Sequence, residues 1–205
     1  MLTELTIKEF LEKIASEFPT PGGGSVAALS AALAASLTEM VANLTINKKG
    51  FEDVEDEMKT VAQEALQLKS KFVQAIDNDS DAYNDVVTAI KLPGETEAEK
   101  RHRGKMIQSG LKQATLVPMA VAEDAIRVME LAGKTIAMGN KNAITDGAVG
   151  VMMAKTAVLS ALYNAKINLI SIKDKAFKDK ILELVKDLET NALSREKELL
   201  SNVDL

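Results

Sequence analysis

The chain has 205 residues, 46% of them hydrophobic, and a formal net charge of −5. This apolar share with interspersed charge excludes a disordered chain, and the acidic balance argues against a nucleic-acid-binding protein. The sequence contains no cysteine and a single histidine, His102. That excludes disulfides, a cysteine nucleophile and a multi-histidine metal site within one chain. We therefore expect any chemistry to come from carboxylates, amides, lysines and backbone groups, without a metal ion.

Helical periodicity extends over nearly the whole chain, and no segment alternates apolar and polar residues with the period of two that marks a strand. A short helix opens at the capping box Thr6–Glu9 and ends before the Phe18–Pro21 segment. Pro118 predicts a kink or a new start within the helix expected at 95–132. The remaining helices are expected at 26–46, 51–91, 95–132, 143–172 and 174–200.

The helices expected at 26–46 and 143–172 are nearly free of charge and rich in small residues, whereas the others are amphipathic. Helices that are apolar on all sides belong at the centre of a bundle. The pattern predicts a single all-α domain, residues 1–205, in which two central small-residue helices are wrapped by longer amphipathic helices.

The N-terminal segment carries Glu4, Lys8 and Glu9 before any apolar run, so no signal peptide is expected. The helix at 26–46 contains too many serines, threonines and asparagines for a membrane span. We expect a cytoplasmic protein that binds neither membrane nor nucleic acid.

A glycine loop, Pro19-Thr20-Pro21-Gly22-Gly23-Gly24-Ser25, leads directly into the first small-residue helix. No strand precedes it, so it is not typical of a dinucleotide-binding turn. It is either a flexible turn in which Ser25 caps the helix, or a loop that lets a ligand reach backbone N–H groups at the helix N-terminus. We favour the binding interpretation because three consecutive glycines cost conformational entropy that a simple turn does not require.

Three carboxylates, Asp77, Asp81 and Asp85, are spaced four residues apart on one helix face, with Asp79 and Tyr83 nearby. Like charges at this spacing repel one another. The simplest interpretation is a solvated acidic face. The alternative is a site for a cationic ligand or for proton transfer, because crowded carboxylates raise one another's pKa.

An Asn/Asp motif, residues 139–146, opens the second small-residue helix. In a purely structural interpretation Asn142 caps this helix and Asp146 complements its dipole. Further along the same helix, Asn164 and Asn168 are four residues apart, hence on one face. Buried amides need hydrogen-bond partners, so these two side chains either join helices or line a polar pocket.

The run Glu99-Lys100-Arg101-His102-Arg103-Gly104-Lys105 is a solvated charged surface by default. Its basic residues also have the charge to attract the anionic tail of a ligand.

Three segments together resemble the formimidoyltetrahydrofolate cyclodeaminase family, which includes the C-terminal half of formiminotransferase-cyclodeaminase and stand-alone methenyltetrahydrofolate cyclohydrolases. The segments are PTPGGGSVAA at 19–28, GNKNAITD at 139–146 and NAKIN at 164–168. The resemblance covers essentially the whole chain in the same order. It implies an all-α fold, a homodimer, a tetrahydrofolate derivative as substrate and no further cofactor.

The resemblance implies an enzyme of one-carbon metabolism, as in histidine degradation, that cyclises 5-formimidoyltetrahydrofolate to 5,10-methenyltetrahydrofolate and releases ammonia. Carboxylates supply the base, the acid and the negative charge that this reaction requires. We assign Asp146 to cation stabilisation and proton transfer, with Asp77 or Asp81 as its partner. The residues expected to bind substrate are Gly22, Gly23, Gly24, Ser25, Asn140, Asn142, Asn164 and Asn168, with the basic run at 100–105 attracting the glutamate tail.

Two alternatives stay open at this point. The same residues suit a cyclohydrolase, in which water opens 5,10-methenyltetrahydrofolate to 10-formyltetrahydrofolate. A non-catalytic helical scaffold is the other alternative, and it predicts that no polar pocket joins the glycine loop to the Asn/Asp motif.

Overall fold

The computed structural model of the chain describes residues 1–204, and its regular elements are all helical. The all-α prediction is confirmed. A short 3-10 helix precedes two of the α-helices given below: Glu52–Val54 lies before α3, and Lys141–Ala143 lies before α5. The α-helices are α1 (Ile7–Ile14), α2 (Gly23–Asn43), α3 (Glu55–Ile90), α4 (Glu97–Met138), α5 (Ile144–Leu169) and α6 (Lys175–Leu200).

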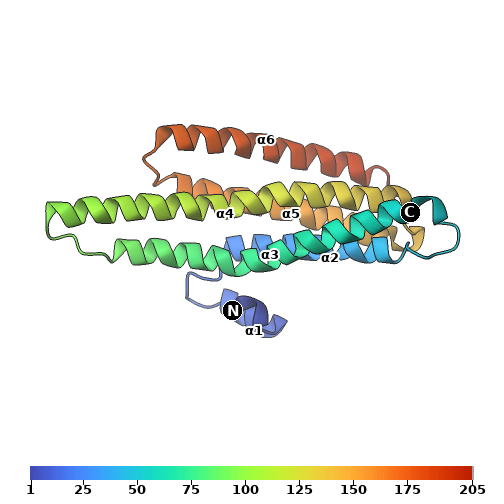
Figure 1. Cartoon of the computed structure of the whole chain (residues 1–205), viewed down its shortest axis with the longest axis horizontal. Coiled ribbons are helices and arrows are strands. Elements are labelled where there is room, and N and C mark those ends of the chain that lie inside the picture. Colours follow the sequence, from blue (N-terminus) through green and yellow to red (C-terminus); the bar gives the residue numbers. More distant parts are fainter. Residues whose placement is uncertain (205) are drawn as a thin grey trace.

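Four long helices, α2 to α5, form the body of the molecule, and successive helices run antiparallel (Figure 1). Helix α6 lies along one edge against α5 and α4, and the short α1 lies at the opposite edge beside the 3-10 turn Leu2–Glu4. Helix α2 contacts α3, α4 and α5. Because α2 and α5 are antiparallel neighbours, the start of α2 lies beside the end of α5, and the end of α2 beside the start of α5.

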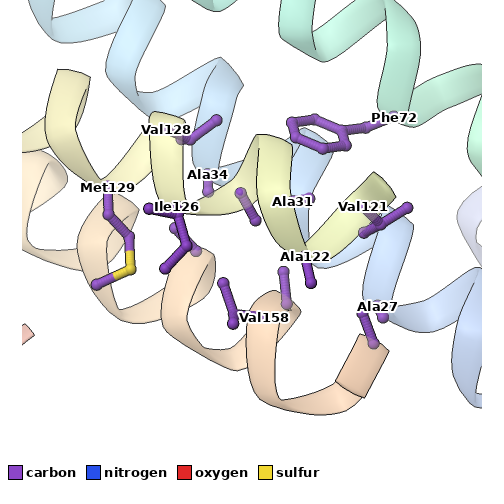
Figure 2. Close-up of a cluster of buried hydrophobic side chains, with 14 of the residues drawn as sticks. Ala27, Ala31, Ala34, Phe72, Val121, Ala122, Ile126, Val128, Met129 and Val158 are labelled. Carbon is purple, nitrogen blue, oxygen red and sulfur yellow. The ribbon is translucent and has the colours of Figure 1, made fainter. Parts of the chain in front are cut away.

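The two small-residue helices occupy the centre, as the sequence predicts. Small side chains let neighbouring helices approach closely, and larger ones from α3 and α4 fill the remaining space. Figure 2 shows this arrangement, with alanines of α2 facing Phe72 of α3 and the aliphatic side chains of α4 and α5. The fully buried members of this core include Ala27, Ala31, Ala34, Phe72, Ala122, Val128, Met129 and Val158.

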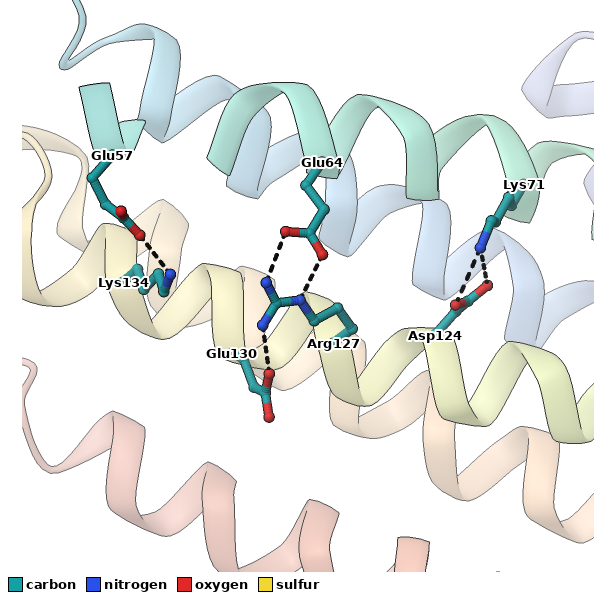
Figure 3. Close-up of polar contacts among 7 residues, drawn as sticks. All are labelled: Glu57, Glu64, Lys71, Asp124, Arg127, Glu130 and Lys134. Carbon is teal, nitrogen blue, oxygen red and sulfur yellow. Dashed lines mark hydrogen bonds and ion pairs between the residues drawn. The ribbon is translucent and has the colours of Figure 1, made fainter. Parts of the chain in front are cut away.

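Ion pairs bridge α3 and α4 on the outside of the bundle (Figure 3). Arg127 holds both carboxylate oxygens of Glu64, at 2.6 and 2.8 Å, and also contacts Glu130. Lys134 pairs with Glu57 at one end of this row, and Lys71 with Asp124 at the other. Partly exposed pairs of this kind contribute little stability each, so their main effect is to fix the register of two long antiparallel helices.

Two segments are long and apolar enough to meet the length and hydropathy criteria for a membrane span, Gly23–Asn43 and Lys141–Leu169. In their most apolar windows, 61% and 50% of the residues are buried inside the bundle. Core helices of a bundle have this character too.

Candidate active site

A cavity of about 460 Å³ opens where α2 begins and α5 ends. This size falls within the range of small-molecule sites. One wall is the glycine loop, and the opposite walls come from α3, α4 and the C-terminal part of α5. The side chains and backbone that line it belong to Pro19, Thr20, Gly22, Gly23, Gly24, Asp79, Tyr83, Val86, Leu111, Ala114, Asn164, Ile167, Asn168, Ile170 and Ser171.

The glycines of the loop allow close approach rather than an unusual backbone. Gly22 precedes α2 with φ −122°, a conformation open to any residue. A Cβ on Gly24 would overlap the Asp79 carboxylate, and a Cβ on Gly23 would lie 3.1 Å from the amide nitrogen of Asn164. The loop therefore packs directly against two polar side chains of the cavity, one from α3 and one from α5.

Ser25 does not cap α2, because the helix begins two residues earlier and Gly22 takes the N-cap position. Its side chain is fully buried, and its hydroxyl lies 2.9 Å from the carbonyl oxygen of Ile76 and 3.2 Å from the Asp79 carboxylate. Ser25 thus joins the start of α2 to α3 and holds the Asp79 carboxylate at the cavity wall.

Among residues 1–204, Asp79 is the one carboxylate that lines this cavity. Burial raises the pKa of the Asp79 carboxyl, and hydrogen bonds from the Ser25 side chain and backbone oppose the rise. A carboxyl group with a raised pKa accepts a proton more readily than an ordinary aspartate, and it stays protonated to a higher pH. Asp79 is therefore the natural acid–base group of the cavity.

The raised pKa also predicts how stability depends on pH. Below the ordinary aspartate pKa, both folded and unfolded chains are protonated. Between the ordinary and the raised pKa, the unfolded chain loses its proton while the folded protein still keeps it. Ionising the partly buried Asp79 costs free energy only in the folded protein, so the free energy of unfolding falls as the pH rises from the ordinary pKa to the raised one. We expect Asp79→Asn to increase Tm by about 2–4 °C at pH 8 and to leave it unchanged near pH 3. Thermal unfolding across this pH range checks the result. A constant difference at all pH values would contradict it.

Asp77 and Asp81 lie on α3 but outside the cavity lining. Asp77 accepts hydrogen bonds from the Leu2 backbone N–H, at 2.6 Å, and from the Thr3 hydroxyl, at 3.0 Å. It thereby fastens the N-terminal segment to α3. Asp81 is exposed. On this geometry, Asp79 is a better candidate than either for the proton-transfer role that the sequence led us to assign to Asp77 or Asp81.

The Asn/Asp motif lies at the other end of the bundle. Asp146 is 18 residues before Asn164 on α5, which separates them by about 27 Å along the helix. Asn140 is buried, and its polar groups are used within the fold. Its backbone N–H donates to Thr45, its side-chain amide to the Leu44 carbonyl, and its Oδ1 accepts from the Asn142 N–H. A single chain therefore does not join this motif to the glycine loop.

Asn164 and Asn168, in contrast, both line the cavity, as the sequence suggested for a polar pocket. The Asn168 amide donates to the carbonyl oxygen of Ala114 at 2.8 Å. That carbonyl would normally accept from the N–H of residue 118, which is a proline. Helix α4 consequently runs without interruption from Glu97 to Met138, and the expected new start at Pro118 is wrong. Asn168 supplies the hydrogen bond that the proline removes.

This arrangement predicts a coupling between Asn168 and Pro118. Asn168→Ala should lower the free energy of unfolding by about 1–3 kcal/mol, because it leaves a partly buried carbonyl without a donor. In a Pro118→Ala background the loss should be smaller, since alanine restores the missing N–H. Asn164→Ala is the matched control, because its amide bonds the Ser160 carbonyl on its own helix. Urea unfolding of the wild type, the two single variants and the double variant measures the coupling, and an equal loss in both backgrounds would refute it.

Asp79 is not among the catalytic residues predicted from the sequence, although its position on α3 carries a signal. Phe72 and Ile76 mark the buried stripe of α3, and Asp79 continues it by one further helical step of three residues. An acidic residue on an apolar stripe is more informative than a row of acidic residues on the exposed side, because burial requires a compensating role.

The family model described as formiminotransferase-cyclodeaminase matches residues 6–187. The chain belongs to this family. The family resemblance expected from the sequence is thereby confirmed.

Individual members of the cyclodeaminase family are similar over nearly the whole chain. The methenyltetrahydrofolate cyclohydrolase of Methylorubrum extorquens is 40% identical over 90% of this chain and 87% of its own length. The formimidoyltransferase-cyclodeaminase of Mus musculus is 30% identical over 93% of this chain, which spans only 36% of that longer protein. The crystal structure of formiminotetrahydrofolate cyclodeaminase from Thermotoga maritima superposes with a TM-score of 0.89 at 30% identity, covering 99% of this chain and 98% of the other.

Proposed function

We propose that this protein is a folate one-carbon enzyme that cyclises 5-formimidoyltetrahydrofolate to 5,10-methenyltetrahydrofolate and releases ammonia. The observation that carries the proposal is the cavity, in which a half-buried carboxyl group and two asparagines meet a backbone loop without side chains. Family membership and the structural likeness to a cyclodeaminase identify the substrate class.

The chemistry requires a proton to move between two nitrogens. N10 of the folate attacks the amidinium carbon carried on N5, and the N10–C bond forms. The N10 proton passes to the amine nitrogen, the C–N bond breaks, and ammonia leaves behind the methenyl cation. Asp79 is placed to relay this proton, because its carboxyl group lines the cavity with a raised pKa. In its ionised form it also stabilises positive charge on the reacting carbon.

A cyclohydrolase is the second candidate, and a specific observation favours it. The Methylorubrum extorquens relative, which the chain matches over 87% of its length, is a methenyltetrahydrofolate cyclohydrolase. In that reaction water adds to the methenyl carbon and the ring opens to the 10-formyl product. Asp79 would then accept the proton of the attacking water.

An assay with both substrates tests the proposal. Purified protein is mixed with 5-formimidoyltetrahydrofolate, and both methenyl absorbance and free ammonia are followed. Stoichiometric ammonia and a rise in absorbance are expected. If only added 5,10-methenyltetrahydrofolate loses its absorbance, the protein is a cyclohydrolase. A protein that converts neither substrate is a scaffold without this activity.

We also propose that the working form is a cytoplasmic homodimer. Helices α2 and α5 leave an apolar surface exposed, which includes Val26, Leu33 and Met40 at seven-residue spacing on α2 and Val149 and Met152 on α5. Three of the four charged residues of these helices pair with neighbouring helices of the same chain, and the fourth is Asp146 near the start of α5. Glu39 pairs with Lys69 of α3, and Lys155 and Lys166 pair with Glu196 and Glu189 of α6. An exposed apolar surface of this kind suits a permanent interface.

The positions of the glycine loop and the Asn/Asp motif at opposite ends of the bundle support a second copy of the chain as the partner that covers the apolar surface of α2 and α5. A twofold axis lying in the surface and perpendicular to the helices would exchange the two ends of the bundle. It would bring the Asn/Asp motif of one chain, with Asp146, to the glycine-loop cavity of the other. In solution, a mass of twice 22.0 kDa is then expected, and Leu33→Glu should yield monomers. A monomeric wild-type protein would contradict the proposal.

A further inference from the structure

The hydroxyl group of Ser25 has more hydrogen-bond acceptors around it than its single proton can serve. The Ser25 side chain is fully buried. Its Oγ lies 2.9 Å from the Ile76 carbonyl oxygen and 3.2 Å from the Asp79 carboxylate. The hydroxyl of Ser80 lies 3.3 Å away on the same helix, α3. A serine hydroxyl donates one hydrogen bond, so Ser25 donates either to the carbonyl or to the carboxylate, but not to both at once.

The protonation state of Asp79 decides which acceptor receives the Ser25 proton. An ionised carboxylate only accepts hydrogen bonds, and a bond to it is stronger than one to a neutral carbonyl, so Ser25 then donates to Asp79. A protonated carboxyl group has a proton of its own to donate to the Ser25 oxygen. The Ser25 hydroxyl is then free to donate to the Ile76 carbonyl. Both acceptors lie within reach of the same oxygen atom, so the change requires only a rotation of the hydroxyl hydrogen.

Few other charges act on Asp79 from the surrounding helices. Among residues 1–204, Tyr83 is the only other side chain of the cavity lining that titrates, and the start of α2, α4 and α5 contribute no charged group to it. Several charged side chains are close to the lining positions in sequence but lie outside the lining, among them Asp77, Asp81, Lys112 and Lys166. The first is bonded to the N-terminal segment, the second is exposed, and the two lysines are paired with carboxylates. Ser25 is therefore the main polar partner of the Asp79 carboxyl group.

We propose that Ser25 is a positioning residue, whose hydroxyl turns between the Asp79 carboxyl group and the Ile76 carbonyl oxygen as a proton leaves and returns to Asp79. Its part in catalysis rests on the proposed function, because it matters only if Asp79 relays a proton. In either state the carboxyl group keeps a hydrogen bond to the same serine and stays at the cavity wall. A proton relay benefits from this, since no heavy atom has to move between the two halves of a turnover.

The rotation of the hydroxyl can be followed at the Ile76 carbonyl group. Ile76–Asp77 is the only Ile–Asp pair in the sequence. Labelling isoleucine with ¹³C at the carbonyl and aspartate with ¹⁵N therefore isolates this one carbonyl in a triple-resonance NMR spectrum. We expect its chemical shift to titrate together with Asp79, because the carbonyl loses the Ser25 hydrogen bond as Asp79 ionises.

Two variants assign this titration to Asp79 and Ser25. Asp79→Asn should abolish it, which separates it from any effect of the neighbouring Asp77. Ser25→Ala should remove most of it, since no hydroxyl is left to move. A carbonyl resonance that does not titrate in the wild-type protein, or that titrates equally in Ser25→Ala, would overturn the proposal.

The pH dependence of kcat tests the link to catalysis. We expect kcat to rise with pH as Asp79 ionises, because the ionised group accepts the proton from the substrate. A hydrogen bond to the ionised carboxylate lowers its pKa, so removing that bond in Ser25→Ala should move the rise in kcat upward by about one pH unit. A rise that stays at the wild-type pH would contradict the positioning role.

Ser30→Ala is the matched control. Ser30 is also a buried serine of α2, but its hydroxyl donates to the Met153 carbonyl at 2.9 Å and lies outside the cavity lining. The control loses a comparable hydrogen bond and should keep the wild-type pH profile. Equal shifts in both variants would show a general loosening of α2 and overturn the proposal. If neither folate is converted at any pH, the proposed function fails, and the carbonyl titration still decides whether the Ser25 hydroxyl follows the Asp79 proton.

Discussion

Replacing Asp79 with asparagine is expected to lower kcat by about 10²–10⁴-fold, the range usual for loss of a general acid or base. Asparagine keeps the size of the side chain and still accepts a hydrogen bond from the Ser25 hydroxyl, so the cavity wall should hold its shape. It cannot, however, exchange a proton with N10 or the departing amine. Methenyl formation at saturating substrate measures the effect.

The control for Asp79→Asn is Asp81→Asn. Both variants remove one negative charge from α3, but Asp81 is exposed and lies outside the cavity lining. The control should retain kcat within about twofold, as expected for a surface substitution away from the site. Because Asp79→Asn is expected to raise Tm near neutral pH, its inactivity would not reflect unfolding. An Asp79→Asn protein with wild-type kcat would show that the reaction uses another acid–base group.

Mixing two inactive variants is expected to restore activity. In the proposed dimer, each site takes Asp79 from one chain and Asp146 from the other. Asp79→Asn and Asp146→Asn should therefore be inactive alone. After subunit exchange, half of the dimers are mixed, and each mixed dimer holds one intact site, so about a quarter of wild-type activity should return. Activity before and after mixing measures the result.

Subunit exchange is checked separately, by mixing affinity-tagged Asp79→Asn with untagged Asp146→Asn and measuring how much untagged chain is retained with the tagged one. If exchange occurs and the two variants still do not complement, Asp79 and Asp146 do not act across subunits. An active Asp146→Asn protein alone would exclude Asp146 from catalysis.

The fold could be predicted from the sequence because the helical periodicity and the small-residue content both indicate a bundle of helices. Helices that are rich in small residues and nearly free of charge, as expected at 26–46 and 143–172, belong in the core, and α2 and α5 pack there against each other. That α4 continues through Pro118 could not be predicted. The side chain that supplies the hydrogen bond missing at the proline belongs to Asn168, which lies 50 residues further along the chain. The residues around Pro118 alone do not indicate that hydrogen bond.

The site was predicted in part. The glycine loop, Asn164 and Asn168 do come together, because α2 and α5 are antiparallel and their start and end meet. The same antiparallel packing places Asp146 at the far end, although both motifs begin a small-residue helix. Helix order is readable from the sequence, but which helix ends meet depends on packing, and a subunit interface lies outside any single chain.

The claim that the glycine-loop cavity holds the reacting carbon is tested most directly by a crystal structure with bound 5-formyltetrahydrofolate, a folate that carries its one-carbon unit on N5. We expect the formyl carbon to lie within about 4 Å of the Asp79 carboxylate, so that a proton can pass directly or with little rearrangement. A folate bound elsewhere, with the space between Gly23, Asp79 and Asn164 left empty, would contradict it.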